Sequence, residues 1–142
     1  MPKTNIDNVF MEIAHSIGKL SYAKRLQVGC IVVKDGNILS MGYNGMPYGF
    51  ENECEFEGTP EHKKLRTKPE VLHAESNAIS KLARSTQSSD GADLYVTDSP
   101  CFDCAKLIIQ SGIKAVYYRG EYRIKDGLVL LEDAGIKVER VV

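Results

Sequence analysis

Apolar side chains recur at intervals of three and four residues along positions 6–20, which is typical of a helix with one buried face. The positions concerned are Val9, Phe10, Ile13, Ile17 and Leu20. Two runs rich in β-branched and aliphatic residues follow, at 28–33 and 38–43. Because Asp35 and Gly36 lie between them, these runs predict a β-hairpin with a tight turn.

The second half of the chain alternates between helical and extended patterns. Helices are predicted over 72–83, 100–110 and 126–134, and strands over 94–97, 115–118 and 136–142. Together with the hairpin, this order predicts an α/β fold, a three-layer αβα sandwich around a mixed, mostly parallel five-stranded sheet. Residues 1–142 show no repeat or linker pattern, so we expect one domain.

Composition narrows the classes of function. The net charge is −1, from 18 basic and 19 acidic residues, so there is no general attraction to a phosphate backbone and nucleic acid is not an expected partner. No apolar run reaches the length of a membrane span, and no secretory leader pattern opens the chain. We therefore expect a cytoplasmic protein, with no membrane partner, whose cysteines carry thiol chemistry rather than disulfides.

Two short motifs contain the residues with the clearest chemistry, His-Ala-Glu at 73–75 and Pro-Cys-Phe-Asp-Cys at 100–104. The imidazole of His73 and the thiols of Cys101 and Cys104 can fill three corners of a zinc tetrahedron. The fourth corner is then left for water, as in catalytic rather than structural zinc sites. Beside that water, the Glu75 carboxylate is the expected carrier of protons.

Each motif opens a predicted helix, and this placement matters for the metal. The positive end of a helix dipole favours thiolates at Cys101 and Cys104. Glu75 lies only two residues from His73, so both side chains can approach one ion only if the helix points its first turn at that ion. We therefore expect zinc between the N-termini of two helices.

The joint pattern His-x-Glu and Pro-Cys-x-x-Cys is the signature of zinc-dependent deaminases, so the chain resembles the cytidine deaminase superfamily. Segments 42–47, 73–79 and 100–113 closely resemble the deoxycytidylate deaminases, and the similarity extends from about Val9 to Val138. This resemblance implies a cytidine deaminase-like fold, catalytic Zn²⁺ and hydrolysis of dCMP to dUMP and ammonia, which supplies thymidylate synthesis. It also implies a homo-hexamer, activation by dCTP, and inhibition by dTTP with Mg²⁺.

The resemblance also suggests substrate contacts. It places Asn44 near the sugar and the backbone around Ala74 at the pyrimidine edge, and Ser99 belongs to the same expected substrate-binding set. A 5′-phosphate needs cations from neighbouring loops. The candidate cations are Lys24, Arg25, Arg119, Arg123 and Lys125, and Tyr122 is expected to stack or hydrogen bond nearby.

The long segment 44–69 has little periodicity, and a loop of that length in a compact domain is usually functional or flexible. With the preceding turn it is the hypothesised site for the dCTP and dTTP effectors. The expected effector residues are Gly42, Tyr43, Gly45, Met46 and Pro47.

Three other interpretations remain open at this point. The chain could be another zinc deaminase of the superfamily, acting on a free pyrimidine, a nucleoside or a tRNA adenosine. It could instead be a non-enzymatic binding module in which His73, Cys101 and Cys104 hold a structural zinc. A second zinc in the long loop would have only Cys54 and His62 as soft ligands, which makes a poor site.

Overall fold

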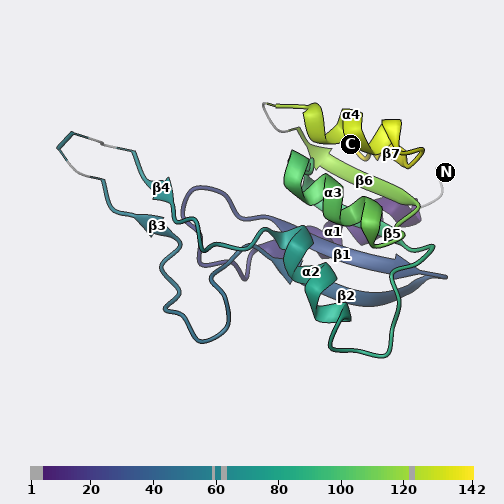
Figure 1. Cartoon of the computed structure of the whole chain (residues 1–142), viewed down its shortest axis with the longest axis horizontal. Helices are drawn as coiled ribbons and strands as arrows, with labels where there is room; N and C mark the ends of the chain where they lie inside the picture. Colours follow the sequence, from purple (N-terminus) through teal and green to yellow (C-terminus); the bar gives the residue numbers. More distant parts are fainter. Residues whose placement is uncertain (1–4, 59, 62–63, 122–123) are drawn as a thin grey trace.

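The computed structural model describes residues 5–58, 60–61, 64–121 and 124–142, and its centre is a five-stranded sheet covered by helices on both faces (Figure 1). The sheet contains β1 (Gly29–Lys34), β2 (Asn37–Tyr43), β5 (Asp93–Asp98), β6 (Ala115–Gly120) and β7 (Lys137–Arg140). The helices are α1 (Ile6–Gly18), α2 (Ala74–Leu82), α3 (Phe102–Gln110) and α4 (Asp126–Asp133). Each of these elements was predicted from the sequence, with ends that differ by a few residues.

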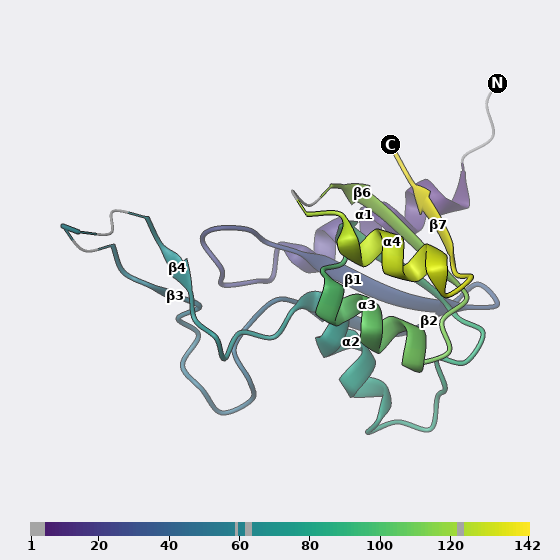
Figure 2. The same cartoon turned by 45° about the horizontal axis from the view of Figure 1, so that its top comes forward.

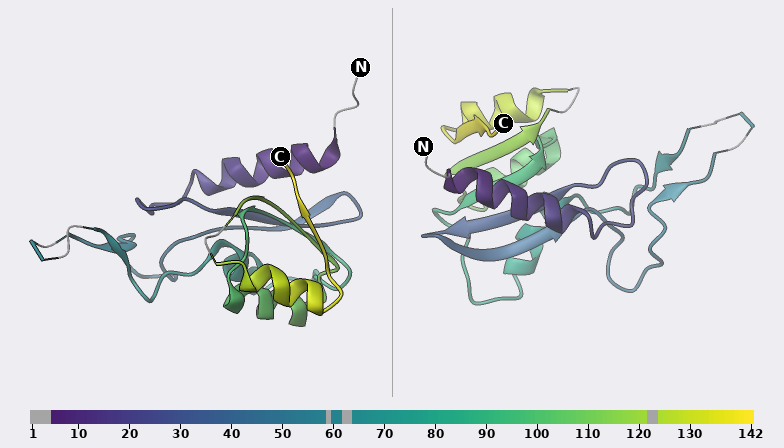
Figure 3. Two further views of the ribbon diagram at one scale, coloured as in Figure 1. Left: turned by 90° about the horizontal axis from the view of Figure 1, so that it is seen from above. Right: turned by 180° about the vertical axis from the view of Figure 1, so that it is seen from behind.

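The three-layer arrangement is confirmed, with α1 alone on one face and α2, α3 and α4 on the other (Figure 3). Phe10, Met11 and Ala14 of α1 pack on Ile31 and Tyr95. On the opposite face the buried residues include Ala78, Val96, Ala105, Ile108 and Leu131. Strand β1 is buried on both faces, which explains its unbroken apolar run.

The predicted hairpin joins β1 and β2, and its two turn residues have left-handed backbones, with φ of 51° at Asp35 and 78° at Gly36. A two-residue turn with positive φ at both positions matches the twist of the flanking strands, and Gly and Asp tolerate that conformation best.

The strand order is β2-β1-β5-β6-β7, and this corrects one detail of the prediction. The sheet is mixed, as expected, but it is not mostly parallel. Strands β5, β6 and β7 run parallel to one another, whereas β1 is antiparallel to both β2 and β5. The connection through α2 passes over β1 and links β2 to β5, which runs in the same direction as β2. A helix therefore lies between two strands of the same direction, as the alternating pattern predicts, although β1 itself has no parallel neighbour.

The long segment before α2 contains two short strands that its sequence did not predict. β3 (Glu55–Phe56) pairs with β4 (Arg66–Thr67) in a two-stranded antiparallel sheet. These strands belong to an arm that extends away from the main sheet (Figure 1, Figure 2). No helix in the described part of the chain has the length and apolar character needed to cross a bilayer.

Candidate metal centre and substrate pocket

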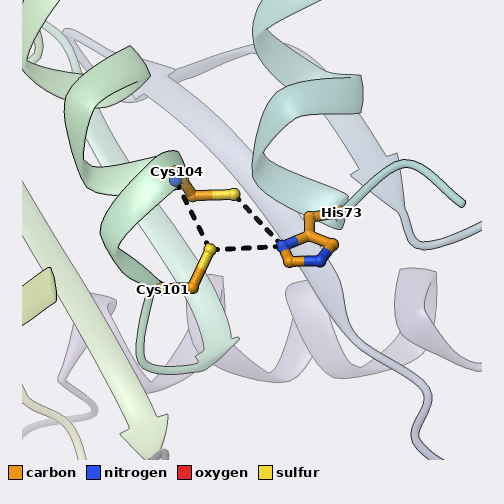
Figure 4. A group of neighbouring side chains, drawn as sticks. All are labelled: His73, Cys101 and Cys104. Carbon is orange, nitrogen blue, oxygen red and sulfur yellow. Dashed lines mark hydrogen bonds between the residues drawn. The ribbon is translucent and has the colours of Figure 1, made fainter. Parts of the chain in front are cut away.

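The structure brings His73, Cys101 and Cys104 together at the adjoining starts of α2 and α3 (Figure 4). His73 is the residue that precedes the first turn of α2, and Cys101 has the same position in α3. The Cys101 Sγ accepts a hydrogen bond from the Cys104 backbone N–H at 3.4 Å, so this side chain caps its own helix. Both motifs therefore begin a helix, as their sequences predict.

The distances within this cluster fit a tetrahedral zinc site. His73 Nδ1 lies 3.4 Å from Cys101 Sγ and 3.3 Å from Cys104 Sγ, and all three ligand atoms lie within 4.8 Å of one another. Two zinc ligands bound at about 2.3 Å (S) and about 2.05 Å (N) would be about 3.6 Å apart at the tetrahedral angle. Among the residues that the structure describes, no other group of three or more His, Cys, Asp or Glu side chains brings its ligand atoms this close together.

The charges in the cluster are strongly coupled. Hydrogen bonds from Cys104 and His73 lower the pKa of Cys101 to about 4, and hydrogen bonding to Cys101 followed by burial raises the pKa of Cys104. The hydrogen bond to Cys101 also raises the pKa of His73. Without a metal ion these opposite shifts favour the thiolate at Cys101 and the thiol at Cys104. A divalent cation would favour the thiolate at both positions.

Glu75 is almost completely buried, at 3% exposure, in the first turn of α2. Burial raises its pKa to about 7, and a hydrogen bond from its own backbone N–H opposes that shift. A carboxyl with a pKa near neutrality can both accept and release a proton under physiological conditions. Its position and titration therefore suit proton transfer.

The start of α2 forms one side of a cavity of ≈ 410 Å³, and Cys101 and Cys104 are not among its lining residues. His73, Ala74 and Glu75 line that side, and Arg25, Glu55 and Thr67 also line the cavity. The remaining lining residues are mostly small or apolar and are Ala23, Leu26, Val28, Asn44, Cys54, Val71 and Asp98. The cavity is large enough for a small ligand, with polar groups at a few fixed points.

Two glycines allow neighbouring elements to approach the metal motifs. A Cβ atom at Gly42 in β2 would lie 2.4 Å from the carbonyl oxygen of Ala74. A Cβ atom at Gly127 in α4 would lie 2.3 Å from the carbonyl oxygen of Pro100 and 2.9 Å from that of Cys101. No side chain larger than hydrogen fits either position without moving the backbone that carries the ligands.

The structure separates the expected substrate residues into groups. Asn44 lines the cavity, where its Oδ1 accepts from Val28 N at 2.9 Å and its Nδ2 donates to Leu26 O at 2.7 Å. These bonds use one of its two amide hydrogens, so the amide can still donate to a ligand. Ala74 also lines the cavity, whereas Ser99 is fully buried beside it and is not a lining residue.

The two loop cations behave differently. Arg25 lines the cavity, but Lys24 does not, and the contact that fixes Lys24 is a bond from its backbone N–H to Glu55. Two other candidates for the 5′-phosphate do not line the cavity: Arg119 pairs with Glu12 at 2.7 Å, and Lys125 pairs with Glu121 at 3.0 Å. Tyr122 and Arg123 lie outside the described residues.

Among the lining residues that the sequence did not predict, three carry an oxygen-bearing side chain: Asp98, Glu55 and Thr67. Asp98 ends β5, and the rule that active sites gather at the carboxyl ends of strands could have found it. Glu55 and Thr67 belong to the arm, where no periodicity marks them.

A family profile described as "Cytidine and deoxycytidylate deaminase zinc-binding region" matches residues 4–119. The chain belongs to this family. It is 38% identical to ComE operon protein 2 of Bacillus subtilis over 99% of its own length and 74% of the relative. It is 35% identical to the deoxycytidylate deaminase of Enterobacteria phage T4, over 92% of this chain and 87% of that one.

Among solved structures, the chain is similar to the dCMP deaminase of cyanophage S-TIM5, crystallised with dCMP and dUMP. The TM-score is 0.89 and the identity 46%, over 99% of this chain and 100% of the other. The predicted resemblance to the deoxycytidylate deaminases is therefore confirmed, as is the cytidine deaminase-like fold.

A second hollow, of ≈ 610 Å³, is lined by four of the five residues expected to bind effectors: Tyr43, Gly45, Met46 and Pro47. Gly42, the fifth, is not a lining residue because it is buried against α2. The hollow is also lined by aromatic, cationic and amide side chains, among them Tyr22, Tyr48, Asn52, Asn77, Lys81 and Arg84.

The second hollow and the metal cavity share a wall. Gly45 and Leu72 line the hollow and bond to each other through both backbone groups, at 3.1 and 2.8 Å. Their chain neighbours Asn44 and His73 line the metal cavity instead, and Cys54 lines both. A ligand that contacts Gly45 and Leu72 in the hollow would thus touch the direct chain neighbours of Asn44 and His73, which line the metal cavity.

Proposed function

We propose that this chain is a zinc-dependent dCMP deaminase that converts dCMP and water into dUMP and ammonia. The observation that carries the proposal is the arrangement of His73, Cys101 and Cys104 around one point, with the buried Glu75 lining the same cavity as His73. The choice of dCMP is supported by the cyanophage enzyme, which is 46% identical over nearly all of both chains and was crystallised with dCMP and dUMP.

In this proposal His73, Cys101 and Cys104 hold the zinc ion, with the sulfurs as thiolates. Bound zinc lowers the pKa of a coordinated water molecule from 15.7 to about 7, which supplies a nucleophile at neutral pH. The reaction needs that oxygen at C4 of cytosine and a proton at the departing amino group.

Glu75 is the proposed proton carrier. Its carboxylate takes a proton from the attacking water and delivers it to the ring nitrogen N3. It then takes the proton of the oxygen added at C4 and passes it to the amino group, which leaves as ammonia while the C4 carbonyl forms. Burial raises the pKa of Glu75 in the metal-free chain, and a carboxyl group shifted toward neutrality is suited to both transfers.

The substrate is bound by the rest of the cavity. Asn44 has one amide hydrogen available for the sugar, and the backbone of Ala74 is the proposed contact for the pyrimidine edge. Arg25 is the proposed partner of the 5′-phosphate, since it is the one Lys or Arg among the described residues that line the cavity. Roles for Lys24, Ser99, Tyr122 and Arg123 in the same site remain predictions from the sequence.

The second hollow is the proposed effector site for dCTP, as activator, and dTTP, as inhibitor. Tyr22, Tyr43 and Tyr48 offer rings for a base, and Lys81 and Arg84 offer charge for phosphates. No carboxylate occurs among the described residues that line it, so Mg²⁺ would arrive bound to the triphosphate. The shared wall gives an effector a short route to the metal cavity.

Assembly and compartment follow from the same proposal. A homo-hexamer is expected from the family resemblance, and exposed aromatic residues on the long segment, Tyr48, Phe50 and Phe56, support association between copies. Reduced thiolate ligands and free nucleotides are both found in the cytoplasm, which is therefore the proposed compartment.

The test is a direct comparison of dCMP, dCTP, deoxycytidine, cytosine and a tRNA as substrates, with ammonia release as the readout. We expect turnover of dCMP at a kcat/KM well above that of the others. Turnover of deoxycytidine or tRNA but not of dCMP would show that another deaminase activity is correct. Zinc binding without turnover of any of them would favour a structural module.

A further inference from the structure

Arg25 is held at both ends by one pair of residues from the arm. Glu55 of β3 and Thr67 of β4 lie opposite each other in the two-stranded sheet. The Glu55 carboxylate accepts from the backbone N–H of Arg25 at 3.4 Å, and Thr67 Oγ1 lies 3.2 Å from Arg25 Nη1. All three residues line the metal cavity.

The Glu55 carboxylate also fixes the residue before Arg25. The Lys24 backbone N–H donates to Glu55 Oε1 at 2.6 Å, and Lys24 N lies 3.3 Å from Oε2. Two consecutive backbone N–H groups of an irregular loop are thus bound by one side chain. Such groups need partners, and this carboxylate determines where the loop backbone lies.

This arrangement leaves the positive charge of Arg25 available. Glu55 contacts Arg25 through the backbone amide rather than through the guanidinium, and Thr67 is uncharged. A guanidinium has five N–H donors in a fixed plane, and the Thr67 contact engages one Nη. A planar group oriented in this way is suited to two parallel hydrogen bonds with a phosphate.

Fixing the side chain in advance also matters for affinity. An exposed arginine is a flexible side chain, and its ordering on binding reduces the affinity for the ligand. The Thr67 contact orders the guanidinium before the ligand arrives, and the Glu55 contacts order the backbone beneath it.

We propose that Glu55 and Thr67 are positioning residues that hold Arg25 for the phosphate of a nucleoside monophosphate, so that the arm is part of the substrate site. The inference rests on the proposed function for the identity of the ligand. It concerns ligand binding and not the chemical step, so it can be tested on a product that does not react.

The experiment measures the affinity of the zinc-loaded protein for dUMP and for deoxyuridine by calorimetry. Thr67→Val removes the hydroxyl and keeps the shape, and Glu55→Gln removes the charge. We expect each change to weaken dUMP binding about tenfold, as for the loss of a hydrogen bond to a charged group, and to leave deoxyuridine binding unchanged. Thr67→Ser retains the hydroxyl and should restore the affinity for dUMP.

A double-mutant cycle decides whether Thr67 acts through Arg25. Arg25→Gln should itself weaken dUMP binding, and adding Thr67→Val to it should then change nothing further. Glu53→Gln is the matched control, because Glu53 is an exposed arm carboxylate whose closest ion pair, with Lys68, is 3.9 Å long. It should bind both ligands like the wild type.

Equal losses for dUMP and deoxyuridine would overturn the inference, because they would indicate a general structural role. Additive effects of Thr67→Val and Arg25→Gln, or no loss in either single variant, would also overturn it. If the wild type fails to deaminate dCMP and yet shows these differences in dUMP binding, the proposed reaction is wrong and the role of the arm stands. In an active enzyme the same variants should raise the KM for dCMP with kcat within about twofold.

Discussion

Gly42 and Ala74 are in such close contact that a Cβ atom on Gly42 would lie 2.4 Å from the Ala74 carbonyl oxygen. The same atom would lie 2.6 Å from the backbone nitrogen of Ala78. Strand β2 therefore supports the first turn of α2 directly, and that turn carries Glu75 and follows His73. The position of His73 relative to Cys101 and Cys104 therefore depends on Gly42.

We expect Gly42→Ala to push α2 away from β2, because the added methyl group meets backbone atoms that no rotamer change can move. Overpacking of this kind costs about 1–3 kcal/mol in the free energy of unfolding. His73 would move relative to Cys101 and Cys104, so zinc affinity should fall. Denaturant unfolding and competitive zinc titration measure the two effects.

Gly45→Ala is the control for Gly42→Ala. It adds the same methyl group where the nearest atom is Tyr43 Cε2, at 3.9 Å. Its zinc affinity and stability should match those of the wild type. If Gly42→Ala bound zinc as tightly as Gly45→Ala, the supporting role of Gly42 would be refuted.

The second prediction concerns Glu75→Gln. The variant keeps the shape of the side chain but cannot carry a proton, so we expect dCMP deamination to fall by at least about 10²–10⁴-fold. Zinc content should stay at the wild-type level, because Glu75 is not a proposed ligand. The melting temperature should not decrease, since the change removes a buried charge. Retained activity in this variant would exclude the proposed proton transfer.

Local sequence patterns were sufficient to predict that His73, Cys101 and Cys104 lie together, and which elements carry them. His73 and the two cysteines each lie at the start of a helix, and the spacing of ligands and helix signals is visible within a few residues. The turn at Asp35 and Gly36 was predicted for the same reason, because the hairpin depends on two adjacent residues.

Features that depend on distant segments were not predicted. The direction of β1 relative to β5 is not encoded in local periodicity, since a strand buried on both faces has the same apolar pattern in either orientation. Glu55 and Thr67 reach Arg25 across 30 and 42 positions of the chain, and their own segments are polar and irregular. Only the fold brings them to the cavity.

The third prediction concerns acid stability and His15. Its Nε2 is buried and has no hydrogen-bond partner among the described residues, and burial lowers the pKa of His15 below 6.5. The unfolded chain therefore binds a proton at a higher pH than the folded chain does. Stability should fall as the pH drops below 6.5, and it should be recovered above that value.

The measurement is the melting temperature at about pH 7.5 and about pH 5.5 for the wild type and for His15→Gln. Groups shared by both proteins, the metal ligands included, cancel in the comparison. We expect the melting temperature to fall further between the higher and the lower pH for the wild type than for His15→Gln. Equal losses would mean that protonation of His15 does not contribute.

The fourth prediction concerns the second hollow. If Arg84 binds effector phosphates there, Arg84→Ala should raise the concentrations of dCTP and dTTP needed for half-maximal effect by about tenfold. Lys114→Ala removes an exposed cation that does not line the hollow, and it should leave both concentrations unchanged. If Arg84→Ala and Lys114→Ala needed the same concentrations of dCTP and dTTP for half-maximal effect, the effectors would bind outside the second hollow.

The most direct test of the whole account is a titration of metal-free protein with zinc, with ammonia release from dCMP measured at each step. The account predicts that activity is absent at the start, rises in proportion to added zinc, and stops rising at one zinc per chain. His73→Ala should remain inactive over the same range. Deamination of dCMP before any zinc is added, or a plateau in activity that does not depend on zinc, would contradict it.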